Sequence, residues 1–191
     1  MKKVEIISAI IGDAVLPLVG FLFWDWGFYF IVLYFLLDLG IRTLFLGKKI
    51  ALLPSIVLPK GFFLKGIGLV ISEVTLLHLL VYFSFKSISF SEEFWAFLSY
   101  EELGIAQGIL LLPLLFFNEI IRIRNEKKIG VPQNVRFEIL KNNQLAGLFR
   151  ILFWSILLLV TLLFSISETT LVVILILTLC AQPFWIYRNI A

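Results

Sequence analysis

Long apolar runs dominate the chain, and short polar segments separate them. A window reading places six such runs at residues 4–23, 27–46, 62–85, 95–120, 148–167 and 170–187. A run of about 20 apolar residues is long enough to cross the hydrocarbon core of a bilayer as an α-helix. We therefore predict an all-α fold, an integral membrane bundle of six transmembrane helices, with residues 1–191 forming a single transmembrane domain.

Two segments between these runs need a separate interpretation. Residues 48–61 read KKIALLPSIVLPKG, with lysines near both ends, two prolines and too few apolar residues to cross a bilayer. We expect this segment to lie in the membrane interface or to re-enter it. Residues 122–147 are rich in arginine and lysine, and we expect them to form a basic cytoplasmic loop that contains one short interfacial helix.

Composition and charge agree with a membrane location. Hydrophobic residues make up 61% of the chain and charged residues 15%, whereas an ordinary soluble domain is about a quarter charged. With the N-terminus inside, all 16 lysines and arginines except Lys86 fall in cytoplasmic segments or at their edges. The positive-inside rule then predicts that both termini are cytoplasmic.

The same charge distribution predicts which partners the protein has. A basic segment beside transmembrane helices is typical of contact with anionic lipid headgroups at the cytoplasmic face, so we expect the lipid bilayer, and no nucleic acid, to be the partner there. The alternative is that the basic loop docks a protein partner.

Few residues are suited to metal or redox chemistry. The chain has one cysteine, Cys180, and one histidine, His78. A disulfide within the chain, a CxxC pair, a zinc site of His and Cys ligands and a bis-histidine haem site therefore cannot be built. We expect no metal and no cofactor.

Ionisable residues inside the predicted spans are the first candidate site. Asp13, Asp38 and Glu73 fall near mid-depth on the first three spans, and Arg42 is the cation that we expect at a similar depth. Placing each such residue within the membrane costs roughly 2.5–3.5 kcal/mol on insertion scales, so each is expected to have a structural or functional role. The group either joins the helices, with Arg42 neutralising an acid of its own helix or of a neighbour, or forms a proton- or cation-linked site. His78 is either a packing residue or a proton relay from Glu73 toward the outside.

The second candidate site begins the fourth span, which reads SYEELGIAQGILLLPLL over residues 99–115. Gly104 and Gly108 form a GxxxG face that predicts a close contact between helices. Glu101 and Glu102 either begin a helix, where acids complement the dipole, or carry out catalysis. The stretch resembles the first motif of the CAAX-protease-like glutamate intramembrane proteases, which implies that these two glutamates activate water. The family pattern has an arginine where this chain has Ala106.

A broader resemblance lies in residues 16–41, LPLVGFLFWDWGFYFIVLYFLLDLGI. It is similar to an uncharacterised family of small polytopic prokaryotic membrane proteins, a domain of unknown function. The resemblance implies a multi-pass topology in the cytoplasmic (inner) membrane of a prokaryote, and no activity.

Three functional hypotheses follow from these residues. The first is a non-catalytic, membrane-embedded binding or partner subunit with a buried polar cluster in the first three helices. The second is a small proton-linked transporter that uses the same cluster. The third is a glutamate-type intramembrane hydrolase that uses Glu101 and Glu102.

Overall fold

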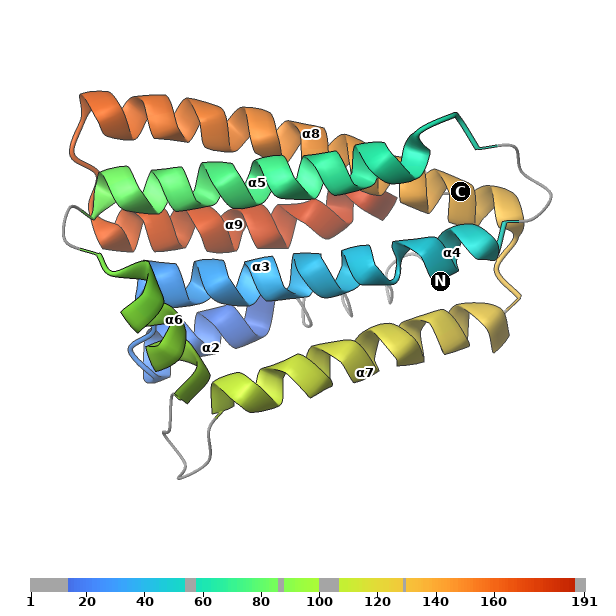
Figure 1. The fold of residues 1–191 in the computed structure, drawn as a ribbon, viewed down its shortest axis with the longest axis horizontal. Coiled ribbons are helices and arrows are strands. Elements are labelled where there is room, and N and C mark those ends of the chain that lie inside the picture. Colours follow the sequence, from blue (N-terminus) through green and yellow to red (C-terminus); the bar gives the residue numbers. More distant parts are fainter. Residues whose placement is uncertain (1–13, 54–57, 86–87, 100–106, 129, 188–191) are drawn as a thin grey trace.

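The fold is helical throughout the part of the chain that the computed structural model describes, residues 14–53, 58–85, 88–99, 107–128 and 130–187 (Figure 1). The helices are α2 (Leu16–Phe23), α3 (Phe28–Leu44), α4 (Leu46–Ala51), α5 (Phe62–Ser84), α6 (Phe90–Ser99), α7 (Gln107–Lys128), α8 (Gln133–Leu163) and α9 (Glu168–Tyr187). The prediction of an all-α chain is therefore confirmed for these residues.

Four of these helices follow the predicted runs closely: α3, α5, α9 and the second half of α8. The run predicted at 95–120 differs, because its described residues belong to two helices, α6 and α7, that point in different directions (Figure 1).

The segment expected to be a basic loop, 122–147, is also mostly helical. Helix α7 continues to Lys128 and α8 begins at Gln133. Arginine, lysine, glutamate and glutamine are good helix formers, so polarity alone does not end a helix. The chain turns at Gly130, whose φ of 66° suits glycine, and Pro132 then precedes α8. Of the segment 48–61, residues up to Ala51 form the end of α4, while residues 54–57 lie outside the described ranges.

The helices present apolar surface outward. Among the described residues, three helical stretches are long and apolar enough to cross a membrane: Phe28–Ala51, Phe62–Ser84 and Gln133–Leu163. Within the apolar 18-residue segment of each stretch, only 28–39% is buried inside the molecule. Outward residues such as Leu64 and Leu159 are 71% and 60% exposed. Apolar surface on this scale is unfavourable in water and favourable against lipid. These features indicate a membrane protein.

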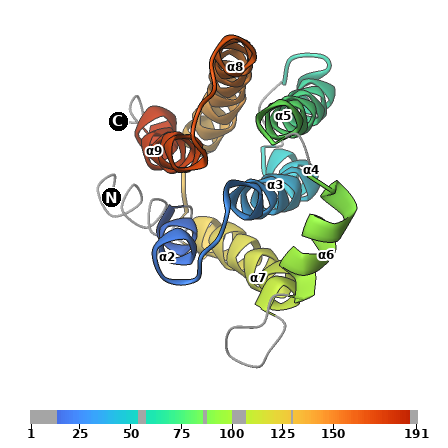
Figure 2. The same ribbon diagram turned by 90° about the vertical axis from the view of Figure 1, so that its left-hand side faces the viewer.

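Helix α3 forms the centre of the bundle. It packs against α2, α5, α6, α7 and α9, which surround it in the end-on view (Figure 2). Its first half, FYFIVLYFLL, is apolar on all sides, as expected for a helix enclosed by other helices. Phe28, Ile31 and Val32 are completely buried. Outside this centre, α5 and α8 lie side by side along most of their length (Figure 1).

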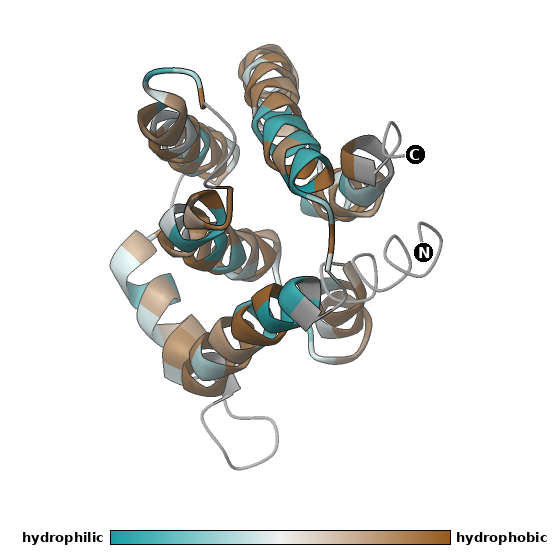
Figure 3. Ribbon diagram, turned by 90° about the vertical axis from the view of Figure 1, so that its right-hand side faces the viewer, coloured by the Kyte–Doolittle hydropathy of each residue, from teal (hydrophilic) through white to brown (hydrophobic). Residues whose placement is uncertain are grey.

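Charge is divided between the two ends of the bundle. The lysines and arginines of the described residues, with the exception of Arg150 near the middle of α8, lie at the end of α3, in α4, at the end of α7 and where α5 and α8 begin. We call this the basic end, and it is rich in hydrophilic residues when viewed end-on (Figure 3). The opposite, acidic end carries Asp25, Glu92, Glu93 and Glu168.

Glu168, at the start of α9, caps the neighbouring helix α3. Its Oε1 accepts a 2.8 Å hydrogen bond from the backbone N–H of Phe28, one of the N–H groups that a helix start leaves without an intrahelical partner. We expect Glu168→Ala to lower the free energy of unfolding by about 1 kcal/mol, as measured for lost caps, and Glu168→Gln to lower it less. Chemical unfolding in mixed micelles would test this. Glu92→Ala, at an exposed acid of the same end, is the control and should have little effect.

Candidate functional site

A buried ion pair joins α5 to α8 near the middle of the bundle. Arg150 donates from Nε to Glu73 Oε1 at 2.6 Å and from Nη2 to Oε2 at 3.0 Å. Trp154 Nε1 donates to Oε1 at 3.2 Å, and the Arg150 guanidinium lies 5.8 Å from the centre of the Phe35 ring on α3. Glu73 is 1% exposed and Arg150 8% exposed. The carboxylate therefore has both oxygens engaged by charged or polar donors.

The ion-pair partner of Glu73, Arg150, differs from the partner that was expected. Arg150 was expected at the edge of the cytoplasmic segment, and Arg42 as the deep cation that neutralises the acids. Helix α8 begins at Gln133, so its first turns lie at the basic end of the bundle. Arg150 is therefore far from the start of the helix, where it faces Glu73. Glu73 is thus joined to α8 and does not form its ion pair within the first three predicted helices.

Asp38 and Arg42 lie on the same helix, α3, and contact each other. Arg42 Nε is 2.8 Å from Asp38 Oδ2, and the two side chains are 19% and 21% exposed. Arg42 was predicted to pair either with an acid of its own helix, four residues away, or with an acid of a neighbouring helix, and the pair with Asp38 is the first of these. Asp13 lies outside the described residues.

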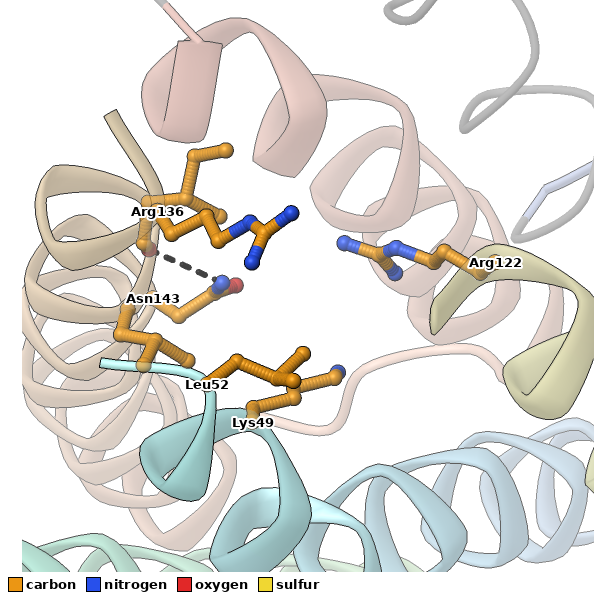
Figure 4. Close-up of a pocket in the computed structure, with 7 residues that line it drawn as sticks. Lys49, Leu52, Arg122, Arg136 and Asn143 are labelled. Carbon is orange, nitrogen blue, oxygen red and sulfur yellow. Dashed lines mark hydrogen bonds between the residues drawn. The ribbon is translucent and has the colours of Figure 1, made fainter. Parts of the chain in front are cut away.

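Two adjoining cavities at the basic end bring many polar side chains together. The smaller, of about 20 Å³, is lined by Lys49, Leu52, Arg122, Arg136, Ile139, Leu140 and Asn143. The larger, of about 100 Å³, shares Lys49, Arg122, Leu140 and Asn143 with it and extends past Arg42, Gln144 and Gln182 to Glu73 and Arg150. We call the two together the basic hollow. Figure 4 shows Lys49, Arg122, Arg136 and Asn143 around the space of the smaller cavity.

Glu119 on α7 holds one wall of the basic hollow. Its carboxylate is ion-paired with Lys49 of α4, and Arg122 Nη1 lies 3.9 Å from its Oε2. Glu119 is 5% exposed. These contacts fix the end of α7 against α4, so that α4 and α7 form a wall opposite α8. Glu119 was not predicted as a site residue, because it falls at the edge of the fourth predicted span.

His78 lies toward the acidic end and packs with aromatic rings. Its Nδ1 is 2.8 Å from the Val74 carbonyl oxygen, which can only accept, so Nδ1 carries a hydrogen. Its Nε2 lies 3.3 Å from the Tyr29 hydroxyl, and the Phe90 ring stands 5.4 Å from the imidazole centre. His78 is thus hydrogen-bonded within α5 and lies against Tyr29 of α3 and Phe90 of α6. Its role as a packing residue or a proton relay stays a prediction.

A wider cavity, of about 420 Å³, opens beside this cluster at the acidic end. Its lining residues are Asp25, Gly27, Tyr29, Phe30, Phe85, Ile88, Glu93 and Glu168. The described residues contain no group of three or more His, Cys, Asp or Glu side chains placed to hold a metal ion.

The predicted site at the start of the fourth span cannot be placed. Glu101, Glu102 and Gly104 lie outside the described residues, and Gly108 falls in the first turn of α7. Their assigned roles stay predictions.

Comparison of the chain with protein-family models, with curated proteins and with solved structures gives no match. The two family resemblances noted in the sequence therefore stay predictions.

Proposed function

We propose that this protein is a non-catalytic, membrane-embedded binding subunit that holds a ligand in the basic hollow. In this proposal the chain crosses the cytoplasmic membrane six times, with both termini and the basic end on the cytoplasmic side. A protein partner of the assembly would approach from the same side.

The observation that carries the proposal is the basic hollow itself. Polar side chains from α3, α4, α5, α7, α8 and α9 converge on it, although the outer surfaces of these helices are largely apolar. Polar groups within a bundle of apolar helices are costly unless they serve packing or a ligand. A cavity of about 100 Å³ is larger than the roughly 10–15 Å³ that one water needs, so packing alone does not account for it.

The buried ion pair favours binding over proton transport. Glu73 accepts three hydrogen bonds, two of them from a guanidinium, so both of its oxygens are already engaged within the protein. A proton carrier needs a carboxylate that water or a solute can reach during its cycle. The transporter hypothesis therefore has less support, and the hydrolase hypothesis depends on Glu101 and Glu102.

Cysteine labelling tests whether the hollow is open and which side it faces. Cys180 is the single cysteine of the chain, so Cys180→Ser provides a background for Asn143→Cys inside the hollow. A charged, membrane-impermeant maleimide should label this variant in inside-out vesicles and leave it unlabelled in intact cells.

Two variants on the same helix calibrate the labelling. Lys141→Cys replaces a side chain that is 60% exposed and should label fully in inside-out vesicles. Leu157→Cys replaces a residue that is 7% exposed and should not label. If Asn143→Cys, like Leu157→Cys, is not labelled, the hollow is inaccessible from the aqueous phase and the proposed function is wrong. Labelling in intact cells would overturn the orientation.

A further inference from the structure

We infer that the basic hollow binds a phosphomonoester, a phosphate group with a single ester bond. The inference rests on the proposed function, since it names the ligand class of that same site.

The lining of the hollow is strongly cationic. Among the described residues that line the two cavities, the cations are Arg42, Lys49, Arg122, Arg136 and Arg150, and the single acid is Glu73. Asp38 and Glu119 contact Arg42 and Lys49 from beside the cavities. Five cations and three acids leave a formal excess of two positive charges. A phosphomonoester carries about 1.5–2 negative charges at neutral pH, which matches that excess.

The acids hold several of the cations in fixed positions. Glu73 holds Arg150, Asp38 holds Arg42, and Glu119 holds Lys49. Side chains that are already positioned lose less conformational entropy when a ligand binds. The cations of the hollow are in this sense preorganised for an anion.

The donors with the best geometry for phosphate are two guanidinium groups. Arg122 on α7 and Arg136 on α8 extend toward the same space from opposite sides, and the Lys49 ammonium approaches that space from below (Figure 4). Asn143 lies beside Arg136, and its amide nitrogen donates to the Ile139 carbonyl oxygen at 3.0 Å. A guanidinium donates two parallel hydrogen bonds to phosphate oxygens, and the Lys49 ammonium suits a further oxygen. A carboxylate offers two oxygens, too few for two guanidinium groups and an ammonium.

Two sources could supply this group: the headgroup of a phosphomonoester lipid, or a soluble phosphate ester. The test measures binding to the purified full-length protein by the shift of its thermal unfolding temperature in neutral detergent. The lipid arm uses phosphatidic acid, with phosphatidylglycerol, a phosphodiester, as control. The soluble arm uses glycerol phosphate and inorganic phosphate, with sulfate as control.

Matched variants locate the binding. Arg122→Gln and Arg136→Gln each remove one cation from the hollow. Arg124→Gln and Lys141→Gln remove the same charge from exposed positions on the same two helices. We expect phosphatidic acid, glycerol phosphate or both to stabilise the wild-type protein. Each hollow variant should weaken binding about tenfold, consistent with the loss of a charged hydrogen bond, and each exposed variant less than twofold.

Each outcome has a defined meaning. Stabilisation by phosphatidic acid alone assigns the site to a lipid, and stabilisation by the soluble esters assigns it to a metabolite. If no phosphomonoester stabilises the protein, or if the exposed variants weaken binding as much as the hollow variants, the inference is overturned. If Asn143→Cys is labelled but phosphomonoesters have no effect, the ligand class alone is wrong; if it is not labelled, the proposed function fails first.

Discussion

Replacing Arg150 with glutamine should lower the free energy of unfolding by about 3–5 kcal/mol, the range found when one partner of a buried ion pair is removed. The Glu73 side chain is 1% exposed when Arg150 is present, so the change removes the charged partner of a buried carboxylate and leaves the Trp154 indole donor. Unfolding in mixed micelles of increasing denaturing-detergent content would measure the loss. A loss below about 1 kcal/mol, the median for exposed pairs, would contradict the burial of the pair.

A double-mutant cycle separates the ion pair from the rest of the packing. Glu73→Gln should also be strongly destabilising, because it leaves the Arg150 guanidinium without its acid. The double variant should be less destabilised than the sum of the two losses, with a coupling energy of roughly 0.5–3 kcal/mol. An additive result would show that the two side chains do not stabilise each other.

The partly exposed ion pair between Asp38 and Arg42 provides a comparison for the buried pair of Glu73 and Arg150. Asp38 and Arg42 are joined by the same kinds of group, but their side chains are 21% and 19% exposed and lie on one helix. An intrahelical pair of this kind contributes about 0.3–0.5 kcal/mol. The coupling energy in the Asp38→Asn and Arg42→Gln cycle should therefore be well below that of the Glu73 and Arg150 cycle.

The helices themselves were predictable, because their main signal is local. The runs expected at 27–46, 62–85 and 170–187 match α3, α5 and α9 to within a few residues. Apolar composition determines such runs without reference to the rest of the fold. The start of α8 was not predictable in this way, since eight of its first fourteen residues are polar and composition does not distinguish a helix of this kind from a loop.

The partner of Glu73 was missed for a different reason. Pairing between helices depends on how each helix is rotated, and apolar residues on all sides leave that rotation poorly defined. One signal was present in the sequence: Arg136, Leu140, Asn143, Gly147, Arg150 and Trp154 alternate at spacings of four and three residues. That spacing places all six on one face of a single helix. Extending the helix back through the basic segment would have brought Arg150 onto the face that meets α5.

Gly20→Ala should lower the free energy of unfolding by about 1–3 kcal/mol, the usual cost of forcing extra atoms into a packed core. A β-carbon at Gly20 would lie 2.3 Å from two ring carbons of Trp26. The ring cannot move away easily, because Trp26 is 3% exposed and its ring packs within 6.4 Å of Phe30, Tyr34 and Phe97. The backbone N–H of Trp26 also donates to the Gly20 carbonyl oxygen at 3.0 Å.

Two further variants show whether the tryptophan ring causes the loss. Gly40→Ala changes a helical glycine whose β-carbon would meet nothing within 4 Å, so it should be neutral or stabilising by up to about 1 kcal/mol, from helix propensity. In a Trp26→Leu background, the additional loss from Gly20→Ala should shrink, because the smaller side chain leaves room for the methyl group. A loss that persists in that background would show that the ring is not what excludes a side chain at position 20. The close approach of α2 to α3 would then need another explanation.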